Sequence, residues 1–266
     1  MKNELHFSIY QKIVLVTLAI AVILFQFVDF SSLGYIKDID MITNSITRFT
    51  AGIFLMLVLM GFGRRDLFTF KNLKKSLLII IPAILISINN FPIIAYLDGR
   101  ANLTEPFYRV ILFLIECLSV GFFEEILFRG ILLIILIEKL NHLKNGMFVS
   151  VLISSLIFGF LHLVNLFEGA SISSTMLQVG YSFLMGMLWA VIYLKTGNLW
   201  LVMILHATYN FFGQVMFYLG SVAGRYDNIT IGVTTILATL AASHVIVLLR
   251  NNKLMVHQEN GEENEI

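Results

Sequence analysis

Long apolar runs follow one another along almost the whole sequence, and they restrict its possible folds more than any other feature. A helix needs about 20 apolar residues to cross the hydrocarbon core of a bilayer. Runs near this length lie at residues 13–30, 46–62, 77–97, 107–137, 147–164, 175–194, 199–219 and 229–249. With 58% hydrophobic and 13% charged residues, the chain is far more apolar than a soluble domain. The sequence therefore predicts an all-α polytopic integral membrane protein with about eight transmembrane helices.

The predicted spans form a single domain. We expect one transmembrane helical domain over residues 1–250, with a motif-bearing core at about residues 105–220, and a short acidic cytoplasmic tail at residues 251–266. Pro82 and Pro92 interrupt the third apolar run, which predicts a helix that kinks or ends early. The fourth run is too long for one straight span.

Charged loops predict the orientation of the chain. Arg64 and Arg65 begin a loop that also holds three lysines up to residue 75, against Asp66 alone. Cytoplasmic loops carry the excess of Lys and Arg, so an even number of spans places both termini in the cytoplasm, in what we expect to be a bacterial plasma membrane. The net charge of +1 provides no basic surface for nucleic acid. A single cysteine, Cys117, excludes a disulfide within the chain.

The fourth run holds three carboxylates and one guanidinium, which are costly in a membrane: Glu116, Glu124, Glu125 and Arg129. Glu124, Glu125 and Arg129 are flanked by large apolar residues, and each such group at the bilayer centre costs about 2.5–3.5 kcal/mol on insertion scales. Glu125 and Arg129 are four residues apart on one helix face, so we predict a buried ion pair with a mainly structural role. Glu124 points about 100° away from that pair. The ion pair therefore does not explain why Glu124 is there, which favours a functional role for this residue.

Two histidines and an asparagine interrupt the later runs. His162 lies one turn after Phe158, and His206 and Asn210 lie one above the other on one helix face. Either histidine alone could be a packing residue in an interhelical hydrogen bond, worth about 0.6–2 kcal/mol. Together with Glu124 on a third helix, they favour a water-handling site inside the bilayer.

Two mechanisms are compatible with these side chains. A glutamate in an apolar cavity can act as a general base toward water, while histidine and asparagine orient the water or stabilise an oxyanion. Glu124, His162 and His206 also form a possible set of zinc ligands. The sequence has no His-Glu-x-x-His motif, and its aspartates all lie at the ends of apolar runs or in loops, which excludes a paired-aspartate site. We expect that no cofactor is required, with zinc as the alternative.

Three short stretches on separate apolar runs resemble the motifs of one protein family. They are Glu124-Glu125-x-x-x-Arg129, Phe158-x-x-x-His162 and His206-x-x-x-Asn210. In this order they resemble the CAAX-protease and bacteriocin-processing family, also called Abi or CPBP intramembrane proteases. The resemblance implies an eight-helix intramembrane endopeptidase of the type that removes the last three residues of prenylated CAAX proteins. It implies that Glu124 and His162 activate the hydrolytic water. By the same resemblance His206 and Asn210 stabilise the oxyanion, with Glu125 and Arg129 as supports.

The sequence thus predicts an endopeptidase that cleaves a peptide or a membrane-associated protein by a glutamate-activated water. Small secreted peptides, bacteriocin precursors or a membrane regulator are favoured as substrates over prenylated proteins. Two alternatives stay open, namely a non-catalytic peptide-binding immunity protein and a proton-coupled transporter that uses the same buried Glu and His residues. A transporter would more often show paired halves with interrupted helices, and the sequence shows no such repeat. The expected partners are the substrate and the lipid bilayer, and the sequence predicts no particular oligomeric state.

Overall fold

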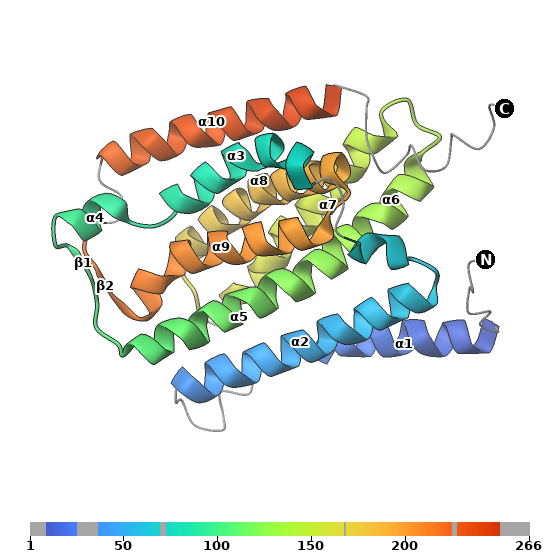
Figure 1. The fold of residues 1–266 in the computed structure, drawn as a ribbon, viewed down its shortest axis with the longest axis horizontal. Helices are drawn as coiled ribbons and strands as arrows, with labels where there is room; N and C mark the ends of the chain where they lie inside the picture. Colours follow the sequence, from blue (N-terminus) through green and yellow to red (C-terminus); the bar gives the residue numbers. More distant parts are fainter. Residues whose placement is uncertain (1–8, 26–36, 70–72, 168, 225–227, 251–266) are drawn as a thin grey trace.

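The computed structural model describes residues 9–25, 37–69, 73–167, 169–224 and 228–250, and it consists of helices with one small pair of strands. The long helices lie roughly side by side along the long axis of the molecule (Figure 1). In chain order the elements are α1 Ile9–Phe25, α2 Lys37–Gly61, η2 Arg65–Phe68, α3 Leu73–Asn89, α4 Ile93–Leu97, β1 Ala101–Leu103, α5 Phe107–Glu125, η3 Ile126–Leu132, α6 Leu133–Leu140, α7 Gly146–Leu161, η4 His162–Leu166, α8 Ile172–Thr196, α9 Leu199–Tyr218, β2 Gly220–Val222 and α10 Asn228–Arg250. The all-α class expected from the apolar runs is confirmed.

Five helices in the described ranges are long and apolar enough to cross a membrane. They are α2, α7 with η4, α8, α9 and α10. The predicted first span continues beyond α1 into residues outside the described ranges, and α3 has 17 residues. Helix α5, which follows β1 and carries Glu124 and Glu125 of the first motif, is not among these five helices. The predicted number of eight spans is therefore not confirmed, and the predicted acidic tail lies outside the described residues.

The third predicted span ends early, as its prolines and asparagines indicate. Helix α3 continues through Pro82 and stops at Asn89. The short helix α4 then begins directly after Pro92. Proline disfavours the helical conformation of the residue before it, so the chain turns between these two helices. The short connection through β1 then leads into α5.

The fourth predicted span is a continuous helical path with an irregular centre. Helix α5 leads into the π-helical segment η3, and α6 follows without a break. A π-helical turn widens the helix and is often found at functional sites. The length of the run predicted that it would not be one straight span, and the structure agrees. Nothing in the sequence indicated a π-helix.

The two ends of the bundle have different charges. At one end Arg64 pairs with Glu138 at 3.4 Å and the Trp200 indole donates to the Phe68 carbonyl at 2.9 Å, which joins the loop after α2 to α6 and α9. We call this the basic end, and it holds Arg64, Arg65, Lys139, Lys144 and Lys195. At the opposite end, β1 pairs with β2 in antiparallel fashion (Figure 1, left). We call this the strand end. An even number of predicted spans separates the loop after α2 from the connections after α6 and α8, and these connections do lie at the same end. The compartment they face stays a prediction.

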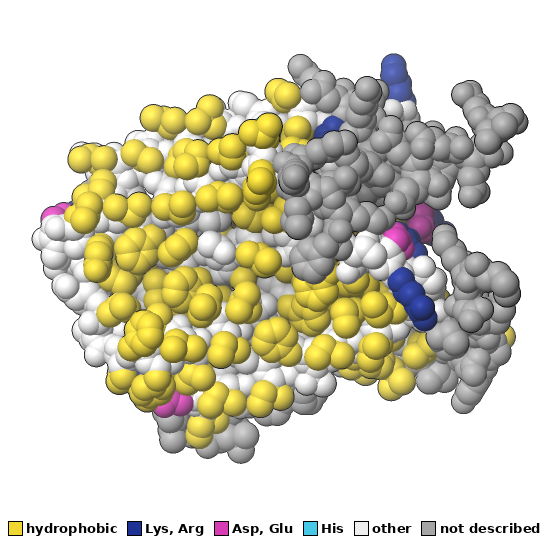
Figure 2. Space-filling model, in the orientation of Figure 1, with side chains coloured by type: hydrophobic (Ala, Val, Ile, Leu, Met, Phe, Trp, Pro, Cys, Tyr) yellow, Lys and Arg dark blue, Asp and Glu magenta, His cyan; other side chains and the backbone are white. Residues whose placement is uncertain are grey.

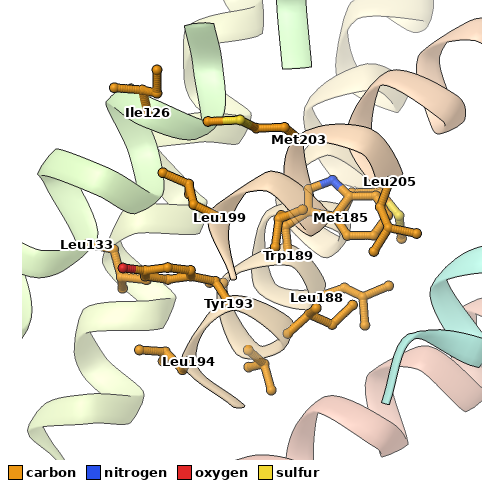
Figure 3. Close-up of a cluster of buried hydrophobic side chains, with 14 of the residues drawn as sticks. Ile126, Leu133, Met185, Leu188, Trp189, Tyr193, Leu194, Leu199, Met203 and Leu205 are labelled. Atoms are coloured by element: carbon orange, nitrogen blue, oxygen red, sulfur yellow. The ribbon is translucent and has the colours of Figure 1, made fainter. Parts of the chain in front are cut away.

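The core of the bundle is formed around α8 and α9. Trp189 and Tyr193 of α8 pack with Leu199 and Met203 of α9 against Ile126 of η3 (Figure 3). All five side chains are almost completely buried. The outer face shown in Figure 2 is covered mainly by hydrophobic side chains, and its visible charged side chains lie toward the ends of the helices. This arrangement fits a protein surrounded by lipid.

A glycine brings α5 and α9 into close contact. A Cβ atom added at Gly121 would lie 2.5 Å from the Met203 carbonyl oxygen and 3.1 Å from the Ala207 nitrogen. Because real Cβ atoms do not approach so closely, any larger residue would push the two helices apart. The contact places the first motif, one turn further along α5, beside His206.

Candidate active site

A cavity of about 260 Å³ lies between α2, α5, α7, α8 and α9. Its walls include every residue predicted to be catalytic: Glu124, His162, His206 and Asn210. These residues belong to α5, η4 and α9, which are far apart in the sequence. The structure thus brings the predicted set together at one cavity, and the chemical role of each member stays a prediction.

Glu125 joins the predicted ion pair to His206. Its carboxylate is fully buried, and Oε1 accepts hydrogen bonds from Arg129 Nη1 at 2.7 Å and from His206 Nδ1 at 2.7 Å. Arg129 also donates to the Gly186 carbonyl at 3.0 Å, and its guanidinium lies 5.0 Å from the centre of the Phe158 ring. The ion pair expected from the sequence spacing is present. Its contact with His206 was not predicted.

Glu124 occupies a different environment from its neighbour. Its side chain is 26% exposed, against 0% for Glu125, and it lines the cavity. Its Oε2 lies 3.7 Å from His206 Nε2, which is longer than a hydrogen bond. The His206 imidazole therefore lies between two carboxylates, with Nδ1 toward Glu125 and Nε2 toward Glu124.

His162 is held by backbone and aromatic contacts. Its Nδ1 lies 2.9 Å from the Phe158 carbonyl oxygen, and its Nε2 lies 3.4 Å from Ser182 Oγ. A carbonyl oxygen can only accept, so Nδ1 carries the hydrogen and Nε2 of a neutral ring is an acceptor. The Phe158 ring packs nearly perpendicular to both imidazoles, with ring centres 5.2 Å from His162 and 5.8 Å from His206. The two histidines of the motifs thus share one aromatic neighbour.

The predicted zinc-ligand set does not converge in this structure. Within the parts of the chain that the structure describes, no three His, Cys, Asp or Glu side chains are grouped so that they could hold a metal ion. Glu124 and His206 face each other, but His162 is not grouped with them closely enough to complete a set of three ligands. These residues do not fit a metal ion in this arrangement.

Sequence reasoning missed a second charged pair on the cavity wall. Arg48 of α2 and Glu116 of α5 both line the cavity, and they form an ion pair at 3.3 Å. Asn44 donates to the same Glu116 oxygen at 3.0 Å. The sequence shows Glu116 as one of the three carboxylates of the fourth run, but it assigns this residue no partner and no role. Arg48 had no comparable signal.

Neutral polar side chains complete the lining. Asn165 Nδ2 donates to Gln178 Oε1 at 2.7 Å, and Tyr181 and Gln214 lie on the same cavity. Asn165 follows His162 by three residues, but its motif context assigned it no role. Gln178, Tyr181 and Gln214 lie in long apolar runs. The sequence alone does not tell whether a polar residue in such a run faces lipid or a cavity.

Comparison with known proteins supports the resemblance given by the motifs. Residues 106–212 match the family model described as type II CAAX prenyl endopeptidase Rce1-like. No curated protein and no solved structure matches the chain. The matched segment runs from the start of α5 into α9 and contains every motif residue that contacts the cavity or supports it. Residues 106–212 are thus similar to the type II CAAX prenyl endopeptidases, which confirms the likeness of this chain to the CAAX-protease family.

Proposed function

We propose that this protein is a CAAX-protease-like intramembrane endopeptidase in which Glu124 activates the hydrolytic water. The observation that carries the proposal is the convergence of Glu124, His162, His206 and Asn210 on one cavity inside an apolar bundle. Ionisable groups inside a membrane protein are costly and commonly mark a functional path. The match of residues 106–212 to a protease family supports a peptidase over other water-handling proteins.

Glu124 has the geometry of a general base. Its partly exposed carboxylate borders the cavity and can take a proton from a water as the water oxygen attacks the scissile carbonyl carbon. The peptide C–N bond then breaks, and the proton passes from Glu124 to the leaving amine. The new acid receives the hydroxyl of the water and the amine receives the proton. His162 can orient the water, because its Nε2 is an acceptor when Nδ1 donates to Phe158.

His206 and Asn210 are the proposed oxyanion donors. Glu125 holds His206 at Nδ1, so Nε2 is the ring atom that faces the cavity and the oxyanion. Glu125 is then a positioning residue that holds the imidazole in place. Asn210, one turn further along α9, adds an amide donor that does not ionise.

Purified protein in detergent tests the proposal in an unbiased peptide-cleavage screen. Glu124→Gln keeps the shape of the side chain but removes its basicity, so cleavage should vanish while expression and membrane insertion persist. Glu138→Gln is the matched control, because that carboxylate is 65% exposed in a surface ion pair, and it should cleave like the wild type. Full activity of Glu124→Gln would refute the assignment.

The same preparation separates the alternatives. A zinc enzyme would lose activity with a chelator, and His162→Ala and His206→Ala would each lose bound metal. Resistance to chelation with loss of activity in Glu124→Gln supports the metal-free mechanism. A wild-type protein that binds peptides from the screen but cleaves none would instead be a binding protein.

A further inference from the structure

The cavity extends from the catalytic residues toward one end of the bundle. Along α9 its lining begins at His206, which is 4% exposed, and continues through Asn210 to Gln214, which is exposed. Helix α9 starts at the basic end and finishes beside β2, so this path leads toward the strand end. Along α8 the exposed Tyr181 and the partly exposed Gln178 likewise lie nearer the strand end than the buried Trp189. The α5 wall stays closed in this direction, because Phe113 and Cys117 are buried in a second core cluster. The cavity therefore opens toward the strand end between η4, α8 and α9.

The opposite direction is closed by the hydrophobic core. Leu133, Tyr193, Leu194 and Leu199 belong to one buried cluster (Figure 3), and each is at most 2% exposed. They lie on the parts of α6, α8 and α9 that run from the catalytic residues to the basic end. None of these side chains lines the cavity. A substrate that reaches Glu124 along the cavity therefore enters from the strand end.

The charges of the two ends indicate which side of the membrane this is. Five Lys and Arg side chains lie at the basic end, in or directly before the connections after α2, α6 and α8, against the two carboxylates of Asp66 and Glu138. At the strand end, Lys37, Arg100 and Arg109 are outnumbered by Asp38, Asp40, Asp98 and Glu105. Because cytoplasmic loops carry the excess of Lys and Arg, the strand end faces away from the cytoplasm. We infer that the active-site cavity opens on the extracytoplasmic side and that its substrate is a polypeptide segment presented there. The substrate part of this inference rests on the proposed function.

The chemistry at the opening fits a peptide backbone. We define the mouth as Asn165, Gln178, Tyr181 and Gln214, all of which are uncharged. Beyond the hydrogen bond between Asn165 and Gln178, the three amides still offer donors and acceptors, which complement the alternating N–H and C=O groups of an extended peptide. The Arg48 and Glu116 charges deeper in the cavity neutralise each other at 3.3 Å. The mouth therefore favours an uncharged stretch of chain over a strongly acidic or basic one.

Cysteine labelling of intact bacterial cells tests the opening without requiring catalysis. Three cysteines are introduced separately into a Cys117→Ala background, and the probe is a membrane-impermeant maleimide. Gln214→Cys reports the mouth, Ser221→Cys in β2 reports the strand end, and Lys144→Cys reports the basic end. We expect the first two to be labelled in intact cells and Lys144→Cys to be labelled only after permeabilisation.

Each departure from this pattern overturns a named step. Labelling of Ser221→Cys only after permeabilisation would reverse the orientation. Labelling of Gln214→Cys only after permeabilisation, with Ser221→Cys labelled outside, would place the opening on the cytoplasmic side. A Gln214→Cys variant that stays unlabelled in both conditions would show that the mouth is closed. Repeating the set with Glu124→Gln should leave the pattern unchanged, so failure of the peptidase proposal and failure of this inference remain distinguishable.

Discussion

Replacement of Arg129 by leucine should destabilise the protein by removing one side of a buried charge cluster. Arg129 is 1% exposed, and it donates to Glu125 at 2.7 Å and to the Gly186 carbonyl at 3.0 Å. In the Arg129→Leu variant, Glu125 stays buried with His206 as its remaining partner. Removing one partner of a buried ion pair costs about 3–5 kcal/mol, and we expect a loss of free energy of unfolding in that range.

A double variant distinguishes lost charge pairing from lost packing. In Glu125→Gln/Arg129→Leu, no charge is stranded and the glutamine carbonyl still accepts from His206 Nδ1. The main remaining cost is the lost hydrogen bond from the Arg129 guanidinium to the Gly186 carbonyl, about 1.5–3 kcal/mol for a bond from a charged group. The double variant should therefore be more stable than Arg129→Leu alone, although it lacks one more native side chain.

Unfolding in detergent micelles, followed by circular dichroism during titration with a denaturing detergent, measures both losses. Arg64→Leu is the control, because Arg64 and Glu138 are 31% and 65% exposed and a surface pair contributes about 0–1 kcal/mol. Equal losses in the single and double variants would show that Glu125 and Arg129 do not depend on each other. A loss in Arg129→Leu no larger than in Arg64→Leu would contradict the buried-pair argument altogether.

Three further substitutions test the site, the packing and the strand end. Asn210→Ala should lower kcat by about 10²–10³-fold, the usual effect of losing one oxyanion donor, and unchanged kcat in a steady-state assay would remove Asn210 from that role. Gly121→Ala should cost about 1–3 kcal/mol by overpacking against an α9 carbonyl, whereas Gly180→Ala, where an added Cβ meets nothing within 4 Å, should be at least as stable as the wild type in the same titration, because alanine favours a helix over glycine. The hydrogen bond from Lys37 lowers the pKa of Glu105, so its stabilising effect is present above the ordinary pKa of about 4.3 and is lost as pH falls through the lower folded value. Glu105→Gln should thus flatten the loss of stability measured in acid, and an unchanged acid profile would argue against this contribution.

Apolar runs predict the helices well but not their polar ends. The predicted second span starts at residue 46, whereas α2 begins at Lys37. Its first turns hold Asp38 and Asp40, which lower hydropathy but suit a helix N-terminus because they interact favourably with the helix dipole. The π-helical geometry of η3 was also outside the reach of periodicity, because its residues are as apolar as those of an α-helix. Pro92, by contrast, marked the early end of the third span directly.

The candidate site was predictable as a set of residues but not as a geometry. Each motif could be found within one apolar run, because an ionisable side chain there is energetically costly and so indicates a function or a partner. The contact between Glu125 and His206 depends instead on the register of α5 against α9, which Gly121 sets through a close backbone approach. Nothing within a single helix reports that register. For the same reason Arg48, whose partner Glu116 lies on another helix, could not be recognised as part of the cavity.

The adjacent glutamates of the first motif show how one helix can provide two chemical roles. Successive residues on a helix project about 100° apart, so Glu125 points into the core when Glu124 borders the cavity. The buried carboxylate, paired with Arg129, binds His206 Nδ1 at 2.7 Å, and the partly exposed one stays 3.7 Å from Nε2. Exchange of roles between them would require the helix to rotate, which the contact at Gly121 prevents. Glu124, the proposed base, is therefore the more distant of the two carboxylates around His206. Glu125, the nearer one, determines where the imidazole lies.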